Sequence, residues 1–195
     1  MQPILVLAAL GGTDCEQIGT GWLAQPANAV SSLAFVAVGG WLLHGAAGRP
    51  ADRVPLVAAG TAMAGVGLAS VAYHGPQPAW AEPVHDGSIA GLGVVLVGLV
   101  VRRVAQRGRR AAAVDARSRW AVGACWAAAL LAYAMGRTGS PFCHPESLWQ
   151  PHAAWHVLSA IALGVAILIK EQGQPSDEKG ERTDKAFSSP WRIDG

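Results

Sequence analysis

Five long apolar stretches constrain the fold of this chain more than any other feature. They cover about residues 25–45, 54–75, 84–103, 119–136 and 150–170, close to the roughly 20 apolar residues that a membrane-spanning helix needs. A backbone in lipid must satisfy its own hydrogen bonds, which predicts a helix for each stretch. Only 14% of the residues are charged, well below the roughly 25% of soluble domains. We therefore expect an all-α membrane protein with a bundle of five transmembrane helices.

The basic residues indicate how this bundle is oriented. Fourteen of the 15 Lys and Arg residues follow the first stretch, follow the third stretch or lie in the C-terminal tail, and the exception is Arg137. Because basic loops remain cytoplasmic, we expect the N-terminus outside and the C-terminus inside. Residues 1–24 then form an extracytoplasmic segment, residues 25–170 the membrane domain, and residues 171–195 a polar, disordered cytoplasmic tail.

The segment after the third apolar stretch is rich in arginine. Such a segment can also bind nucleic acid, which is the alternative interpretation. A position beside the membrane explains the charges without a further assumption, so we expect no nucleic-acid partner. The residues concerned are Arg102, Arg103, Arg107, Arg109, Arg110, Arg117 and Arg119.

Three histidines lie at the predicted outer ends of the apolar stretches. His74 ends the second stretch, and His152 and His156 begin the fifth. The last two are four residues apart, so both imidazoles project from one face of a helix. The predicted topology places all three in the extracytoplasmic leaflet. Three imidazoles, with a water in the fourth position, are the ligands of a catalytic zinc site.

Two further polar residues are expected at the same depth. Ser70 precedes His74 by one helical turn, and Asp86 stands at the start of the third stretch. Zinc lowers the pKa of a bound water to roughly 7. Asp86 would then act as the general base for this water, and Ser70 would orient it or stabilise an oxyanion.

Each of these residues also has a structural interpretation. A single histidine at a helix end is more often interfacial, a serine more often packs between helices, and an aspartate more often caps a helix. His44 and His144 lack neighbouring ligands and are interpreted as interfacial. His85 adjoins Asp86, but we expect it to point elsewhere on the helix and leave it out of the site.

Four segments of the chain resemble the alkaline ceramidase family, part of a membrane hydrolase superfamily that includes the adiponectin-receptor-like proteins. The resemblance covers the chain from about residue 14 to residue 170. The family has seven spans, whereas this chain has five predicted ones, and the shortfall lies between the Asp86 helix and the last helix. The segments are Cys15-Glu16 followed by residues 25–35 (QPANAVSSLAF), residues 67–74 (GLASVAYH), Asp86, and residues 152–156 (HAAWH).

The resemblance implies an activity and a set of roles. It implies that His74, His152 and His156 bind zinc and that Asp86 and Ser70 assist the zinc-bound water. It also implies hydrolysis of the amide bond of a ceramide-like membrane lipid. The missing spans leave the shape of the lipid tunnel, and hence the substrate, open.

Some members of the family have a second site, for calcium, near the N-terminus. Asp14, Glu16 and Asn28 match that region, which makes them candidates for such a site. Gln25 stands where those proteins have a glutamate. The loss of one carboxylate weakens the binding of a hard cation, so Gln25 argues against calcium here.

Two of the three cysteines, Cys15 and Cys143, lie outside in the predicted topology. That compartment permits a disulfide, and both a Cys15–Cys143 bond and two free thiols are open at this point. Cys125 lies within the fourth stretch and is expected to pack there.

Three functions are compatible with these observations. The leading hypothesis is a zinc-dependent lipid amidohydrolase in which the substrate reaches the site laterally from the outer leaflet. The second is a non-enzymatic membrane receptor or sensor with structural zinc. The third is a small ion or proton transporter, which ranks last because the polar residues lie in one leaflet and form no ladder across the membrane.

Overall fold

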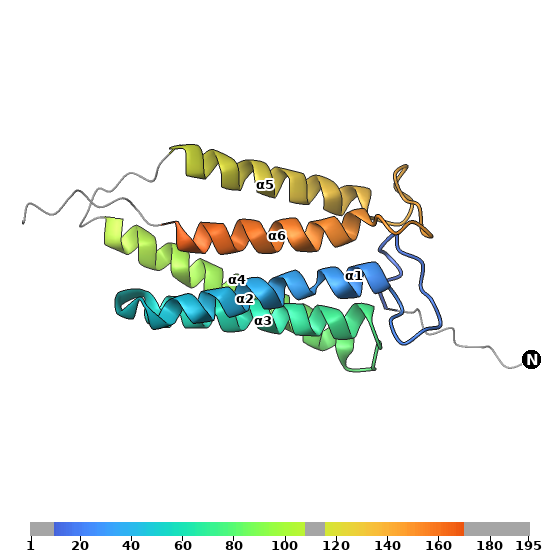
Figure 1. Ribbon diagram of the computed structural model, residues 1–195, viewed down its shortest axis with the longest axis horizontal. Helices are drawn as coiled ribbons and strands as arrows, with labels where there is room; N and C mark the ends of the chain where they lie inside the picture. Colours follow the sequence, from blue (N-terminus) through green and yellow to red (C-terminus); the bar gives the residue numbers. More distant parts are fainter. Residues whose placement is uncertain (1–9, 108–115, 170–195) are drawn as a thin grey trace, which may run out of the picture.

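The computed structural model shows a helical bundle, and it describes residues 10–107 and 116–169. All five apolar stretches are helical (Figure 1). Within these ranges the one β feature is an isolated antiparallel bridge between Asp14 and Arg137. The predicted cytoplasmic tail, as well as Arg109 and Arg110, lies outside the described residues. The helices are α1 (Pro26–Ser31), α2 (Leu33–Ala47), the 3-10 helix η1 (Pro50–Asp52), α3 (Arg53–His74), α4 (Ala81–Arg107), α5 (Ala116–Met135) and α6 (Pro151–Leu168).

Four segments of the described chain are long and apolar enough to cross a membrane. They are Pro26–Ala47, Pro50–His74, Ala81–Ala105 and Pro151–Leu168, which match the first, second, third and fifth predicted stretches. The fourth predicted stretch forms helix α5 but is not one of the four. Two arginines near the start of α5 and several aromatic residues lower its apolar character.

The first span consists of two short helices in succession. Pro26 opens α1, where the missing N–H of proline costs nothing. The chain makes a turn at Ser32, and α2 continues from Leu33. Ser32 is fully buried, and its hydroxyl donates a hydrogen bond to the carbonyl oxygen of Asn28 at 2.7 Å. This break places polar groups inside the bundle close to the start of α6.

Helices α2 and α3 form the most extensive helix–helix contact of the described bundle, and their backbones approach closely. A Cβ atom at Gly39 would lie 2.6 Å from the carbonyl oxygen of Gly60, and a Cβ atom at Gly60 would lie 2.8 Å from the carbonyl oxygen of Gly39. Small residues allow the backbones of membrane helices to approach this closely. Leu42 and Met63, both fully buried, belong to the apolar core beside this contact.

Helices α4 and α6 pack on different parts of the bundle, and in the described chain a gap separates the backbone of α4 from α5 and α6. Helix α4 packs against α3, and α5 packs against α6, while α6 also contacts α1 and α2. In the described part of the chain, the backbone of α4 approaches neither α5 nor α6. The guanidinium of Arg103 joins α4 to the last turn of α6, with hydrogen bonds to the carbonyl oxygens of Ala166 (3.0 Å) and Ile167 (2.7 Å). Figure 1 shows the two helices close at this end and apart toward the start of α4.

The surface of α4 is suited to lipid. Only 6% of its most apolar window is buried inside the protein. Val94, Val97 and Val101 are among the apolar side chains that it exposes. Exposed apolar area of this extent marks a surface that contacts a membrane or a partner.

We expect the α2–α3 contact to tolerate no side chain at Gly60. Gly60→Leu should lower the free energy of unfolding by about 1–3 kcal/mol or more, because the new side chain overpacks two adjoining backbones. Gly65→Leu is the matched control, since a Cβ atom at this position of the same helix meets nothing within 4 Å. Thermal unfolding in detergent measures both variants. Equal midpoints for the two would contradict this account of the packing.

Candidate metal centre

Three buried histidines converge at one end of the bundle. His74 is the last residue of α3, and His152 and His156 lie on the first two turns of α6. One potential ligand atom from each lies within 4.8 Å of the other two. Their exposed fractions are 1%, 6% and 4%. Among the residues that the structure describes, this is the one group of three or more His, Cys, Asp or Glu side chains that can hold a metal ion.

The start of α6 is shaped to present two of these ligands. Pro151 opens the helix, so that His152 and His156 follow on one face at a spacing of one turn. The end of α5 packs directly against this turn. A Cβ atom at Gly136 would lie 2.5 Å from the backbone nitrogen of His152 and 2.9 Å from its Cα atom. A glycine at position 136 therefore allows the approach that sets the position of His152.

Two of the histidines are oriented by oxygen atoms at Nδ1. Nδ1 of His74 lies 2.7 Å from Oε1 of Gln25, which can only accept, so this nitrogen carries the proton. Nδ1 of His156 lies 2.9 Å from Oγ of Ser31 and 3.2 Å from the carbonyl oxygen of Asn28. Because the Ser31 hydroxyl donates to that same carbonyl oxygen at 3.0 Å, Nδ1 of His156 is the donor in both contacts. Nε2 then has the free electron pair in both rings. A hydrogen bond at the second ring nitrogen is the usual support of a metal-binding histidine.

His152 faces a carboxylate in place of a neutral oxygen. Its Nδ1 lies 3.4 Å from Oδ1 of Asp14, which is longer than a good hydrogen bond, and this nitrogen has no closer partner in the described chain. Asp14 is held by Arg137, whose Nη1 donates to the same oxygen at 3.0 Å. Burial raises the pKa of Asp14 to about 6, against the opposing effect of the Arg137 charge. Asp14 is thus a neighbour of the histidine group.

Gln25 has a role that the sequence analysis missed. Its side chain is fully buried, and Nε2 donates hydrogen bonds to the carbonyl oxygens of Gly11 (3.1 Å) and Glu16 (2.9 Å) while Oε1 accepts from His74. A carboxylate could not donate to those carbonyl groups. Gln25 therefore connects the N-terminal segment to His74 through its amide. Only the fold brings these groups together, so no spacing in the sequence signals this role.

The three residues predicted for a calcium site have separate environments. The Glu16 carboxylate accepts hydrogen bonds from the backbone N–H groups of Ala27 (2.6 Å) and Asn28 (2.8 Å), at the start of α1. Burial raises the pKa of Glu16, and these two hydrogen bonds oppose the shift. The Asn28 side chain is fully buried, and its amide atoms have no hydrogen-bond partner in the described chain. Since Asp14 is paired with Arg137, both carboxylates have protein partners, and calcium binding here stays a prediction.

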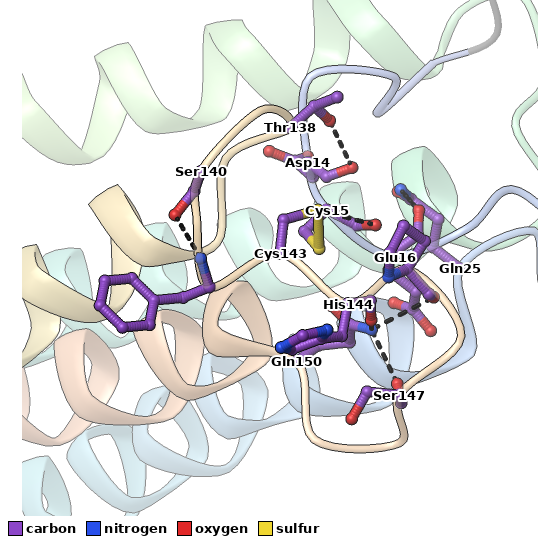
Figure 2. The surroundings of a disulfide bond; sticks show 12 residues. Asp14, Cys15, Glu16, Gln25, Thr138, Ser140, Cys143, His144, Ser147 and Gln150 are labelled. Atoms are coloured by element: carbon purple, nitrogen blue, oxygen red, sulfur yellow. Dashed lines mark hydrogen bonds between the residues drawn. A yellow bond between two sulfur atoms is a disulfide. The ribbon is translucent and has the colours of Figure 1, made fainter.

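The structure joins Cys15 and Cys143 in a disulfide (Figure 2), with a Cα–Cα distance of 5.4 Å. The bond links the N-terminal segment to the loop between α5 and α6. The backbone N–H of Cys15 also donates to the carbonyl oxygen of Gly136 at 2.8 Å. Asp14, which adjoins Cys15, is thereby held beside His152. Cys125 is a free, partly buried thiol on α5, 3.3 Å from the carbonyl oxygen of Leu158.

Of the two predicted catalytic residues, Ser70 lies at the cavity and Asp86 does not. Ser70 is buried, at 2% exposure, and lines the cavity beside His74. The Asp86 side chain is 72% exposed and is not part of the cavity wall. The residue that faces the cavity is His85, which stacks on Tyr73 at a ring distance of 4.4 Å. The expectation that Asp86 faces the site and His85 points elsewhere is therefore wrong.

The start of α4 explains this exchange. The helix begins at Ala81, so position 86 is the sixth residue of the helix and not its cap. Successive residues of a helix point about 100° apart, so one neighbour faces inward and the other outward. The two side chains remain connected, because Nδ1 of His85 lies 3.0 Å from Oδ1 of Asp86. Of the remaining histidines, His44 is exposed in the last turn of α2 and His144 lies in the loop before α6.

A cavity of about 470 Å³ opens from the three histidines into the bundle. This volume is within the range of small-molecule sites, roughly 300–1,000 Å³. The cavity is polar at the metal end and apolar over the rest of its wall. Its polar lining includes Asp14, Ser70, Tyr73, His85 and Arg137, and its apolar lining includes Phe35, Ile89, Leu92, Leu96, Trp126 and Leu163.

Comparisons of the chain with protein-family models, with curated proteins and with solved structures found no match. The resemblance to the alkaline ceramidases therefore depends on the residue pattern alone. The convergence of the three histidines is independent of that resemblance, because it follows from the fold.

We expect Gln25 to control the metal affinity. Gln25→Ala removes the acceptor at Nδ1 of His74 and should lower the affinity for zinc about 10–100-fold, which is the usual effect of losing such a partner. The matched control is Gln17→Ala, because Gln17 is exposed in the same segment. Competition with a chromogenic chelator measures the affinities. An unchanged affinity in Gln25→Ala would show that this hydrogen bond does not support the ligand.

Proposed function

We propose that this chain is a zinc-dependent membrane hydrolase that cleaves the amide bond of a ceramide-like N-acyl lipid. The observation that carries the proposal is the group of three buried histidines at the polar end of an apolar cavity. Imidazole nitrogen suits several transition metals. Three nitrogen ligands with an open fourth position are characteristic of zinc hydrolases, whereas structural zinc sites usually have four protein ligands.

The proposed protein spans the membrane five times, with α5 as the fourth span and the metal centre in the extracytoplasmic leaflet. The disulfide at this end of the bundle favours an oxidising compartment. Trp22, Trp80 and Trp149 are exposed just before α1, α4 and α6, at the ends of the helices that surround the site. Exposed tryptophans are typical of a membrane–water interface. Arg102 and Arg103 lie near the opposite end of α4.

His74, His152 and His156 would hold the zinc through Nε2. When bound, zinc lowers the pKa of a water to roughly 7 and polarises a carbonyl group. The Ser70 hydroxyl, on the same cavity wall one turn before His74, would donate a hydrogen bond to the carbonyl oxygen of the amide. In the overall reaction the water oxygen bonds to the carbonyl carbon, the C–N bond breaks, and a proton passes to the amine.

The exchange of His85 and Asp86 changes the proposed proton path. His85 faces the cavity, and its Nδ1 is hydrogen-bonded to the exposed Asp86 carboxylate. His85 would therefore transfer a proton from the attacking water to the leaving amine. Asp86 would orient the imidazole of His85 from outside the cavity, which makes Asp86 a positioning residue.

The non-enzymatic alternatives have less support. A receptor or sensor in which zinc has only a structural role would be expected to supply a fourth side chain as a zinc ligand. The described chain offers three such ligands, and the open side faces a cavity. A transporter needs polar groups through the depth of the membrane. The buried ionisable residues of the described chain are confined to the end of the bundle that holds the metal centre.

The double variant His152→Ala/His156→Ala tests the proposal. It should abolish zinc binding and the turnover of long-chain N-acyl lipids, because two of three ligands are removed. His44→Ala is the control, since His44 is exposed outside the site. Elemental analysis and product detection by mass spectrometry measure the two effects. Full zinc occupancy with retained activity in the double variant would overturn the proposal.

A further inference from the structure

The metal cavity lies in the seam where α4 separates from α5 and α6. One face of α4 lines it with residues at successive helical turns, namely Ile89, Leu92, Gly93 and Leu96. Across the seam the cavity is lined by Trp126 of α5. No backbone contact between α4 and α5 closes this seam in the described chain. The Arg103 hydrogen bonds to α6 hold α4 only at the end away from the histidines.

The seam opens on the outer surface of the bundle. Gly93 lines the cavity but is itself exposed, and a Cβ atom added to it would meet no atom within 4 Å. Ile89, one turn earlier, is 48% exposed. Both residues lie within the candidate span Ala81–Ala105. The opening at Gly93 therefore faces the hydrocarbon of the membrane.

The walls of the seam define the chemistry of its ligand. Beyond His85, the α4 residues that line the cavity are all apolar, as is Leu163 on α6, whereas the ionisable side chains of the cavity gather around the three histidines. A polar headgroup would lose its water here without a hydrogen-bond partner, which is costly. A hydrocarbon chain would meet only apolar surface and would point away from the metal.

We propose that the α4–α5 seam is the lateral entrance of the site and binds a single long acyl chain, with Gly93 at its mouth. This inference rests on the proposed hydrolase function and adds the position of the entrance, with the acyl chain of the amide lipid lying between α4 and α5. A side chain in place of Gly93 closes the entrance to long chains. The metal centre, at the other end of the cavity, stays intact.

Photo-crosslinking tests the seam without depending on catalysis. The probe is a ketone analogue of a long-chain N-acyl lipid, in which CH2 replaces the amide N–H and a diazirine sits at the middle of the acyl chain. In zinc-loaded wild-type protein, the crosslinks should map to residues 89–96 of α4 and to the α5 peptide with Trp126. Crosslinks on the α2 and α3 surfaces instead would overturn the proposal.

Two glycine variants sharpen the test. Gly93→Phe fills the mouth and should reduce crosslinking and long-chain turnover about tenfold or more, the order by which an apolar pocket discriminates chains. It should retain zinc binding and turnover of an N-acetyl analogue. Gly91→Phe is the control, because Gly91 also has open space around its Cβ position but does not line the cavity. Equal crosslinking in both variants would contradict the assignment of Gly93.

The two proposals fail in different ways. If wild-type protein hydrolyses none of the amides but shows the expected crosslinks, the hydrolase function is wrong and the seam remains a lipid-binding site. If it hydrolyses both the long-chain and the N-acetyl amide and Gly93→Phe leaves the turnover of both unchanged, the function stands and the entrance lies elsewhere.

Discussion

The orientation of the histidine rings is the constraint on which the rest of the site depends. Three imidazoles in one place bind a metal only if each directs an unprotonated nitrogen at the same point. The hydrogen bond from Nδ1 of His74 to Gln25 fixes that choice for one ring, and the contacts of Nδ1 of His156 with Ser31 and with the Asn28 carbonyl group fix it for another. These acceptors belong to the segment that leads into α1 and to α1 itself. The break after α1, the disulfide and the packing of the N-terminal segment hold these partners in place around the three histidines.

The bundle combines one rigid part with one open part. Helices α2 and α3 are in close contact through Gly39 and Gly60, and α6 packs on α2. This part carries the three histidines on α3 and α6. Helix α4, by contrast, packs against α3 while its described backbone does not approach α5, and a cavity extends from the three histidines along α4. A rigid ligand set beside an open apolar seam is the arrangement that a membrane hydrolase of lipids requires.

Much of this could be predicted from the sequence, and the failures have physical causes. Apolar length predicted the helices, and the four-residue spacing of His152 and His156, with the topology, placed both near His74. The sequence did not predict which residues of α4 face the cavity. The helix starts a few residues earlier than expected, so that His85 and not Asp86 faces the cavity. The role of Gln25 depends on tertiary contacts that leave no periodic signal. The fourth predicted span is helical as α5, but it is not among the four segments that are apolar enough to cross a membrane, because two arginines lie at its start.

X-ray absorption spectroscopy at the zinc edge tests the central claim most directly. Purified protein should contain one zinc ion with three imidazole nitrogens at about 2.0–2.1 Å and one further light ligand, as in catalytic zinc sites. His74→Ala should lose one imidazole from this pattern or lose the metal. The absence of zinc, the presence of sulfur ligands, or an unchanged three-imidazole signal in His74→Ala would contradict the account.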